Sequence, residues 1–389
     1  MIQEAKTIRD RLVADRRWLH AHAETGFDLQ ETREYVRQRL TDMGYTPRDC
    51  GQCGLIADIG TGEKTFLLRA DMDALPIREE SGLDFAAGRG SMHACGHDLH
   101  TAMLLGAAQL LKNHESELHG RVRLMFQSAE ELLAGAADMI AGGALKGVDA
   151  AMMIHATVGP LPVGTAIVCS PGVSAPGADF FTITVHGKSC HGSAPQNGVD
   201  PILAAAHLVI AIQSIQTREL GLEDQAVMTV GSVQGGTAAN IIADTVTLQG
   251  SLRAMDERVR QKLKVRLVEI SRGISDVLGA EAKVFFDSGC PCLKNDAKVS
   301  VSVTKSVKKM LGTDRAFTTM ELSPNGKPTA GGSEDFAYVS QQIPAVMVAL
   351  AAGDPGYPLH HPKVRFDEDA LPYGAAIYAQ SAMDWLQAK

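Results

Sequence analysis

The opening part of the chain alternates between stretches with helical periodicity and short, continuously apolar stretches. The apolar residues Tyr35, Val36 and Leu40 share one helical face, and Gly44 is a natural residue to end that helix. Apolar runs such as residues 54–60 are typical of strands buried on both faces of a sheet. The alternation predicts an α/β layered domain with a largely parallel or mixed sheet. We expect helices at 2–22, 31–43 and 98–113 and strands at 54–60, 64–70, 121–127 and 149–155.

The pattern changes near Gly177. Residues 179–186 alternate between apolar and polar side chains with a period of two, as a half-buried strand does. The elements expected from there follow the order strand, helix, strand, strand, helix, strand, which is a ferredoxin-like α+β unit. We expect strands at 179–186, 226–233, 243–253 and 281–287 and helices at 200–217 and 256–279, followed by α/β elements at 296–312, 345–350 and 369–387.

The length of 389 residues suggests two domains. Because the α/β character returns after the ferredoxin-like unit, the smaller domain is expected to be an insertion in the larger one. We predict a layered domain formed by residues 1–177 and 295–389, with residues 178–294 inserted as the smaller domain.

Charge and hydropathy indicate which partners and which cellular locations to expect. The chain has 37 basic and 45 acidic residues, a net charge of −8, and no long basic run, so neither nucleic acid nor an anionic membrane is an expected partner. The N-terminus has no apolar segment of the kind found in secretory signals, and the most apolar helical stretch, 202–215, is too short to span a bilayer. Seven cysteines in a chain of this length do not form a disulfide framework. We expect a cytoplasmic globular protein.

Several expected strands end in side chains that can bind metal. In open α/β sheets, ligands bind beyond the carboxyl ends of the strands. Cysteine, histidine and carboxylate together suit a divalent ion such as Zn²⁺ or Mn²⁺, with Co²⁺ and Ni²⁺ as further candidates, and the number of donors favours a two-metal site. The candidates are Asp71 and Asp73 after one strand, Cys95 and His97 in SMHACGHDLH (91–100), Glu130 and Glu131 after the next strand, His155, and His360 with His361.

Each candidate also has a structural interpretation when it is taken alone. His97 could cap a helix, Cys95 could be a small buried residue, and Asp71 could bond to nearby backbone. Glu130 and Glu131 could be a solvated helix start, or one could bind metal while the other accepts a proton from metal-bound water. The coincidence of all of these at strand ends favours a site.

Four motifs stand out along the chain: RADMDALP (69–76), MHACGHDLHT (92–101), QSAEE (127–131) and GGSEDF (331–336). Together they resemble those of the metal-dependent amidohydrolases, in the subgroup that carries a cysteine. This group includes hippurate hydrolases, auxin-conjugate hydrolases and N-acetyl-diaminopimelate deacetylases, and it is related to aminoacylases and dipeptidases. The resemblance runs through nearly the whole chain. It implies a catalytic domain with a mixed central sheet and an inserted lid or dimerisation domain.

The resemblance also implies a reaction and partners. The expected substrate is a small N-acyl amino acid, whose amide is hydrolysed to a carboxylate and a free amino acid. The expected assembly is a homodimer or a tetramer. A dipeptidase or aminopeptidase on the same scaffold is the nearest alternative, and a non-catalytic metal- or ligand-binding protein is a more distant one.

By the same resemblance, two divalent ions are held by five residues. Cys95 would bridge both ions, His97 and His155 would complete one site, and Glu131 and His360 the other. Glu130 would act first as general base and then as general acid, and Asp73 would orient a ligand.

The inserted domain is expected to contribute three further residues. His191, in GKSCHGSAP, resembles a lid histidine that reaches a neighbouring subunit's active site and donates to the oxyanion. Asn240 and Arg253 resemble residues that hold the substrate's carboxylate, a task that suits the bidentate guanidinium. Gln196 stands where a second lid histidine is frequent, and Ser128 where proline is frequent, so the preferred substrate stays open.

Overall fold

The structure, a computed structural model, describes residues 1–323 and 332–388. The described residues form two compact units. The first unit contains Met1–Ser174, the segment from Leu293 to residue 323, and the segment from Asp335 onward. The second contains Ala175–Cys292 with residues 332–334. Gly331, the first residue of the GGSEDF motif, lies outside the described residues.

The first unit is built on a mixed eight-stranded sheet, as expected, with the order β1-β2-β4-β3-β5-β16-β6-β15. The neighbouring strands β4, β3, β5 and β16 run parallel to one another, whereas β1 and β2 are antiparallel additions at one side. The carboxyl ends of the four parallel strands therefore meet at one edge. The strands are β1 (Arg48–Cys50), β2 (Gly54–Gly60), β3 (Thr65–Asp71), β4 (Arg121–Gln127), β5 (Ala150–Thr157), β6 (Ala166–Val168), β15 (Ala316–Thr318) and β16 (Ala345–Ala351).

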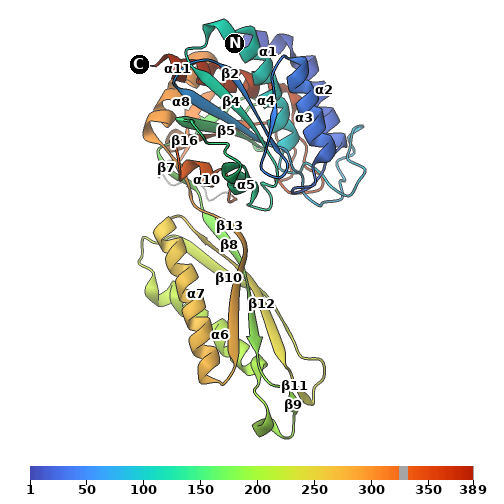
Figure 1. Ribbon diagram of the computed structural model, residues 1–389, viewed down its shortest axis with the longest axis vertical. Helices are drawn as coiled ribbons and strands as arrows, with labels where there is room; N and C mark the ends of the chain where they lie inside the picture. The colour runs from blue at the N-terminus through green and yellow to red at the C-terminus, as the bar shows by residue number, and fades with distance from the viewer. Residues whose placement is uncertain (324–331, 389) are drawn as a thin grey trace. The chain divides into compact units, whose positions relative to one another are not determined.

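Helices cover this sheet (Figure 1). Nearly every residue of α4 is buried, because α4 packs against β3 as well as against α2 and α11. An expected single helix at 2–22 is instead two helices, because the backbone at Ile8 leaves the helical region with φ −99° and ψ 9°. The helices are α1 (Ile2–Thr7), α2 (Arg9–Ala21), α3 (Gln30–Asp42), α4 (His97–Asn113), α5 (Gly135–Ala141), α8 (Ala297–Leu311), α9 (Thr319–Leu322), α10 (Ala337–Ser340) and α11 (Leu371–Gln387), with short 3₁₀ turns at Glu115–Glu117 and Glu368–Ala370.

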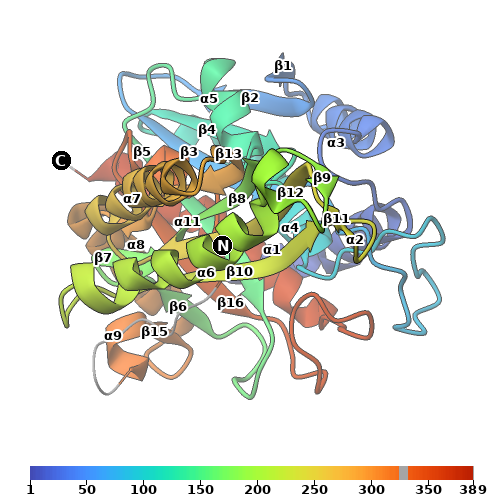
Figure 2. The same ribbon diagram turned by 90° about the horizontal axis from the view of Figure 1, so that it is seen from below.

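The second unit has the ferredoxin-like order of elements that the sequence predicts. Its antiparallel sheet has the order β10-β12-β8-β13, and α6 and α7 lie side by side against it (Figures 1 and 2). The alternation expected at 179–186 is present, since Phe181, Ile183 and Val185 are buried. The elements are β8 (Gly177–His186), α6 (Pro201–Ser214) with a π-helical turn at Ile215–Glu219, β10 (Ala226–Gly235), β12 (Thr245–Ala254), α7 (Glu257–Val277) and β13 (Glu281–Cys290), with a small two-stranded sheet of β9 (Cys190–His191) and β11 (Ile241–Ile242) and a 3₁₀ turn at Pro195–Asn197.

Two short strands of the first unit stand where the chain enters and leaves the second. β7 (Gly172–Ala175) pairs with β14 (Leu293–Asn295), and the Asn295 side chain donates to Ser174 Oγ at 2.8 Å. The second unit is therefore inserted between two adjacent strands.

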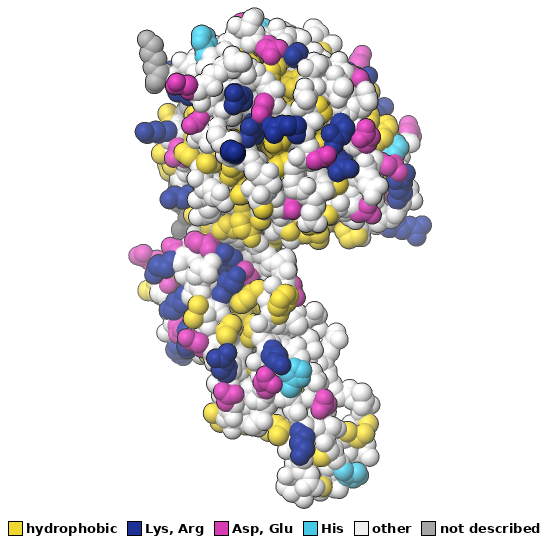
Figure 3. Space-filling model, in the orientation of Figure 1, with side chains coloured by type: hydrophobic (Ala, Val, Ile, Leu, Met, Phe, Trp, Pro, Cys, Tyr) yellow, Lys and Arg dark blue, Asp and Glu magenta, His cyan; other side chains and the backbone are white. Residues whose placement is uncertain are grey.

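The distribution of charged side chains and the hydropathy of the helices agree with the sequence composition. On the face of the first unit seen in Figure 3, Lys and Arg side chains are interspersed with Asp and Glu side chains. Among the described residues, no helix is long and apolar enough to cross a membrane.

Candidate metal centre

The turn that follows β4 carries two adjacent glutamates to the carboxyl edge of the sheet. Ala129 and Leu133, on either side of them, have positive φ angles of 55° and 53°, so the turn is sharply folded. The Asp73 carboxylate accepts from the backbone N–H of Glu130 at 3.0 Å and of Glu131 at 3.2 Å. Asp73 thus fixes the direction in which both glutamates leave the backbone.

The start of α4 brings His97 to the same edge. Gly96 precedes it with φ +91°, and a Cβ at Gly96 would lie 3.1 Å from Phe366 and 3.3 Å from Ala156. Glycine therefore serves both the left-handed backbone and the close packing. His97 Nδ1 lies 2.7 Å from the Asp73 carbonyl oxygen, to which it can donate, and this leaves Nε2 facing the glutamates.

Five side chains converge at this edge, from segments far apart in the sequence. Cys95 Sγ lies 3.5 Å from His155 Nε2 and 3.3 Å from His360 Nε2. Glu131 Oε1 lies 3.6 Å from His360 Nε2 and 3.8 Å from His97 Nε2. Two ligands bound tetrahedrally at 2.0–2.3 Å are about 3.3–3.8 Å apart, so these separations suit shared ions. Two groups of donor atoms share Cys95: Cys95, His97 and His155, and Cys95, Glu131 and His360. A further group joins His97 to Glu130 and Glu131.

Polar atoms without hydrogen-bond partners also fit a bound cation. In the part of the chain that the structure describes, buried His97 Nε2 and Glu131 Oε1 have no such partner. A buried polar atom in this state is costly unless another group satisfies it. Burial lowers the pKa of His155 to about 4, so its imidazole is neutral, which is the form that binds metal. Burial raises the pKa of the Cys95 thiol, so a thiolate there needs a nearby cation. The donor set therefore fits divalent metal ions.

The loop after β16 distinguishes the two adjacent histidines. His360 has φ +65°, its N–H donates to the Ala94 carbonyl at 2.9 Å, and its side chain is half exposed beside the cluster. His361 instead stacks on Tyr357, with 4.5 Å between ring centroids, and its Nδ1 accepts from the Lys363 N–H. His360 is the residue that joins the cluster.

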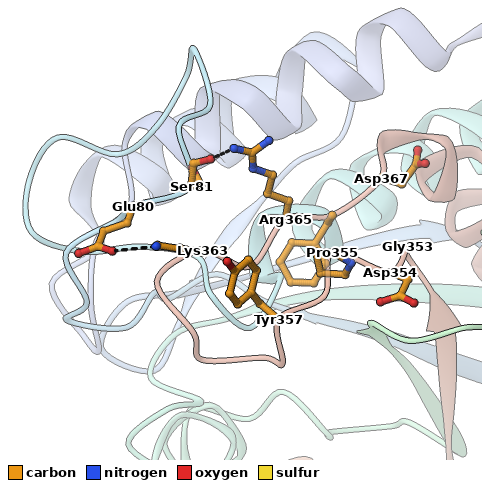
Figure 4. A pocket seen from close by; sticks show the side chains of 10 residues that line it. Glu80, Ser81, Gly353, Asp354, Pro355, Tyr357, Lys363, Arg365 and Asp367 are labelled. Atoms are coloured by element: carbon orange, nitrogen blue, oxygen red, sulfur yellow. Dashed lines mark hydrogen bonds and ion pairs between the residues drawn. The ribbon is translucent and has the colours of Figure 1, made fainter.

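A pocket of about 540 Å³ lies beside the loop that carries His360 (Figure 4). The two cationic side chains that line it are directed at its wall, since Lys363 pairs with Glu80 at 3.9 Å and Arg365 donates to the Ser81 carbonyl. These contacts tie the loop to residues 80–81, and they help to fix the loop near His360.

A buried polar network that was not expected from the sequence lies beneath the cluster. Arg69, fully buried in β3, donates to Asp71 at 2.6 Å and to Asp335 at 2.9 Å. Gln127 also donates to Asp335, and the Asp335 N–H lies 3.4 Å from Glu130 Oε1, which accepts from it. An arginine inside an otherwise apolar strand is the one sequence signal that could have pointed to this network.

The three residues expected from the inserted domain lie in two places within the second unit. His191 is paired opposite Ile241 in the two-stranded β9–β11 sheet, and the Gly192 N–H donates to the Asn240 carbonyl at 2.8 Å. Arg253 lies near the far end of β12, roughly 25 Å away at about 3.3 Å per residue, where it donates to Ser333 Oγ at 2.8 Å. The structure therefore brings His191 and Asn240 together but not Arg253, and the roles of all three stay predictions.

Comparison with protein families gives a match over most of the chain. Residues 67–384 match the model described as peptidase family M20/M25/M40. This range contains every residue of the five-donor cluster.

Comparison with individual proteins finds relatives along almost the whole chain. The chain is 37% identical over 381 residues to an N-acetyl-L-cysteine deacetylase of Bacillus subtilis, covering 97% of this chain and 88% of the relative. It is 38% identical over 388 residues to IAA-amino acid hydrolase ILR1-like 2 of Arabidopsis thaliana, covering 98% of this chain and 86% of the relative. Among solved structures, it is similar to the Bacillus subtilis YXEP protein, described as a dinuclear metal-binding peptidase of the M20 family, with a TM-score of 0.81 and 33% identity over 99% of this chain and 100% of that one.

Proposed function

The chain belongs to peptidase family M20/M25/M40, and on that premise we propose that it hydrolyses the amide bond of N-acyl amino acids to a carboxylate and a free amino acid. The observation that carries the proposal is the cluster of five donor side chains with Glu130 beside it. Relatives named N-acetyl-L-cysteine deacetylase and IAA-amino acid hydrolase support the same reaction. The chain is a hydrolase of linear amides.

We infer that the cluster would hold two divalent ions, with Cys95 as the donor common to both groups. His97 and His155 would hold one ion and Glu131 and His360 the other, as the two groups of donor atoms suggest. Zn²⁺ or Mn²⁺ suits these donors, with Co²⁺ and Ni²⁺ as further candidates. When bound, such ions lower the pKa of a coordinated water and polarise a carbonyl oxygen.

Glu130 is the proposed proton carrier. Its carboxylate is largely buried, one oxygen accepts from the Asp335 N–H, and the other lies 4.0 Å from His97 Nε2 at the cluster. In this position the carboxylate can accept a proton from the attacking water as the carbon–oxygen bond forms. It can then return that proton to the nitrogen of the departing amine as the carbon–nitrogen bond breaks.

The second unit is proposed to supply the contacts to the rest of the substrate. His191 would donate to the oxyanion, and Asn240 and Arg253 would hold the carboxylate of the amino acid. Since His191 and Arg253 lie roughly 25 Å apart within one unit, one copy of the chain cannot bring both to one small substrate through this unit alone. This separation supports a homodimer, or a tetramer built from it, in which His191 and Asn240 serve the neighbouring copy.

A substrate panel tests the proposal. The purified protein, loaded separately with Zn²⁺, Mn²⁺ and Co²⁺, is incubated with acetyl, benzoyl, indoleacetyl and succinyl amino acids and with free dipeptides. Hydrolysis of N-acyl amino acids in preference to dipeptides is expected. Preference for dipeptides would favour a dipeptidase or aminopeptidase, and no hydrolysis with any metal would favour a non-catalytic binding protein.

A further inference from the structure

His100 lies beneath the metal-binding cluster and uses both of its ring nitrogens there. It is completely buried, one turn after His97 in α4. Nδ1 lies 2.6 Å from Asp71 Oδ1, and Nε2 lies 2.7 Å from the backbone nitrogen of Ala156. His100 therefore connects the ends of two strands, β3 through Asp71 and β5 through Ala156.

These contacts fix the protonation of the ring. A backbone N–H can only donate, so the Ala156 N–H requires an unprotonated Nε2 on His100. The ring proton then resides on Nδ1 and is donated to Asp71. Although Asp71, His97 and His100 lie close enough together to be considered as a metal-binding group, no lone pair remains on His100 for an ion.

The bond to Ala156 bears directly on a proposed metal ligand. Ala156 follows His155, and its carbonyl oxygen lies 2.7 Å from His155 Nδ1 and accepts from it. The residue that orients the His155 ring through its carbonyl is thus held by His100 through its N–H. The rings of His100 and His155 are also in contact, with 4.8 Å between centroids.

The other end of the ring is equally well fixed. The second oxygen of Asp71 accepts from Arg69 at 2.6 Å, and the Asp71 carbonyl accepts from Thr101 Oγ1 at 2.7 Å. His100 therefore bonds to a carboxylate that is itself held in place. Two consecutive residues of α4, His100 and Thr101, bond to Asp71 at the end of β3.

We propose that His100 is a positioning residue for one of the two ions, the ion held by Cys95, His97 and His155. His100 aligns α4, which carries His97, with the end of β5, which carries His155. Loss of His100 is expected to weaken the binding of that ion selectively. Glu131 and His360 belong to other segments, the turn after β4 and the loop after β16. The inference rests on the two-ion centre proposed above.

Two variants separate the two bonds of His100. Asparagine places an amide near the position of Nδ1, so His100→Asn keeps a donor for Asp71 and loses the acceptor for Ala156. Glutamine reaches the position of Nε2, so His100→Gln keeps an acceptor for the Ala156 N–H. Titration of the full-length, metal-free protein with Co²⁺ or Zn²⁺ against a competing chelator gives two dissociation constants for each variant, and thermal unfolding of the same metal-free samples reports stability.

The expected result is selective. His100→Asn weakens the affinity for one of the two ions about 10- to 100-fold and leaves the affinity for the other unchanged. Losses of this size are typical when a residue that hydrogen-bonds to a metal ligand is removed. His100→Gln restores part of that affinity, although the two variants unfold at similar temperatures without metal. A role in packing alone would not distinguish Asn from Gln in this way.

His93 offers a matched control. It is a second buried histidine of the SMHACGHDLH segment (91–100), and neither of its ring nitrogens has a hydrogen-bond partner in the described part of the chain. His93→Asn is expected to leave both dissociation constants unchanged. Wild-type affinities in His100→Asn, or an equal loss in His93→Asn, would overturn the role of His100 while leaving the two-ion centre intact. Binding of fewer than two ions by the wild type would overturn the two-ion centre and this inference with it.

Discussion

Arg69 sits between two buried carboxylates at the edge of the sheet, and both carboxylates depend on it. Its guanidinium donates to Asp71 and Asp335, and all three side chains are completely buried. A buried charge that loses its partner is far more costly than an exposed one. Through the Asp335 N–H, the same contacts also hold the loop that touches Glu130.

The Arg69→Leu variant should therefore be strongly destabilised. We expect a loss of about 3–5 kcal/mol in the free energy of unfolding, measured by urea denaturation. Arg89→Leu is the control, because Arg89 pairs with Glu31 at 3.0 Å on the exposed surface, where ion pairs contribute little. Equal losses in the two variants would contradict the importance assigned to the buried network.

His20 gives the first unit a pH-dependent contribution to stability. Burial alone would lower the pKa of His20, but contacts with Asp98 at 2.9 Å and Glu79 at 3.1 Å outweigh burial and raise it to about 9. Because the pKa is raised in the folded state, the contribution is fully present below the unfolded value near 6.5 and is lost as the pH rises through about 9. Its size is on the order of 3 kcal/mol.

Urea denaturation at about pH 6 and about pH 9.5 measures this effect. The wild type is expected to lose more stability between these pH values than His20→Gln, which cannot acquire the charge. Parallel losses in the two proteins would show that the His20 contacts do not control the pH dependence.

The backbone between Cys95 and the start of α4 is constrained in two ways, by a left-handed φ angle and by close packing. Gly96 and Gly143 have nearly the same φ, +91° and +90°. A Cβ at Gly96 would press on Phe366 at 3.1 Å, whereas a Cβ at Gly143 would meet nothing within 4 Å. The two glycines therefore separate the cost of the backbone conformation from the cost of crowding.

Both Gly96→Ala and Gly143→Ala should lose about 1–2 kcal/mol for the left-handed backbone. Gly96→Ala should lose more than this, and it should also bind metal more weakly, because His97 directly follows. Urea denaturation and chelator competition on both variants test the difference. Identical behaviour of the two variants would mean that packing around Gly96 does not position His97.

Helices and strands can be predicted from the sequence where a pattern of neighbouring residues defines them. The long buried strands and amphipathic helices were placed within a few residues, because their apolar periodicity is a local property. The three-residue strands β6 and β15 were missed, because pairing with distant strands rather than apolar pattern defines them. The two glutamates and the cysteine–histidine segment were singled out because each is a compact cluster in the sequence. The contact of Arg69 with Asp335 and that of His100 with Ala156 depend on long-range packing, so no local pattern reveals them.

At the scale of the whole molecule, all five donor side chains belong to the first unit, and the second unit is inserted between the paired strands β7 and β14. Replacing Ala175–Cys292 with a short glycine linker should therefore leave a folded protein that binds two metal ions. It should lose at least about 100-fold in turnover, since His191 and Arg253 would be absent. Metal analysis and amide hydrolysis by the shortened chain test this. Loss of metal binding would show that the second unit helps to form the centre.

Glu130 is proposed to carry the proton for amide hydrolysis at a centre formed by Cys95, His97, Glu131, His155 and His360. The most direct test compares the rates at which metal-loaded wild type and Glu130→Gln hydrolyse N-acyl amino acids, with the metal content of both proteins measured in the same samples. Glu130→Gln is expected to keep both ions and to lose about 10²- to 10⁴-fold in kcat. Equal rates with equal metal content would contradict this role of Glu130.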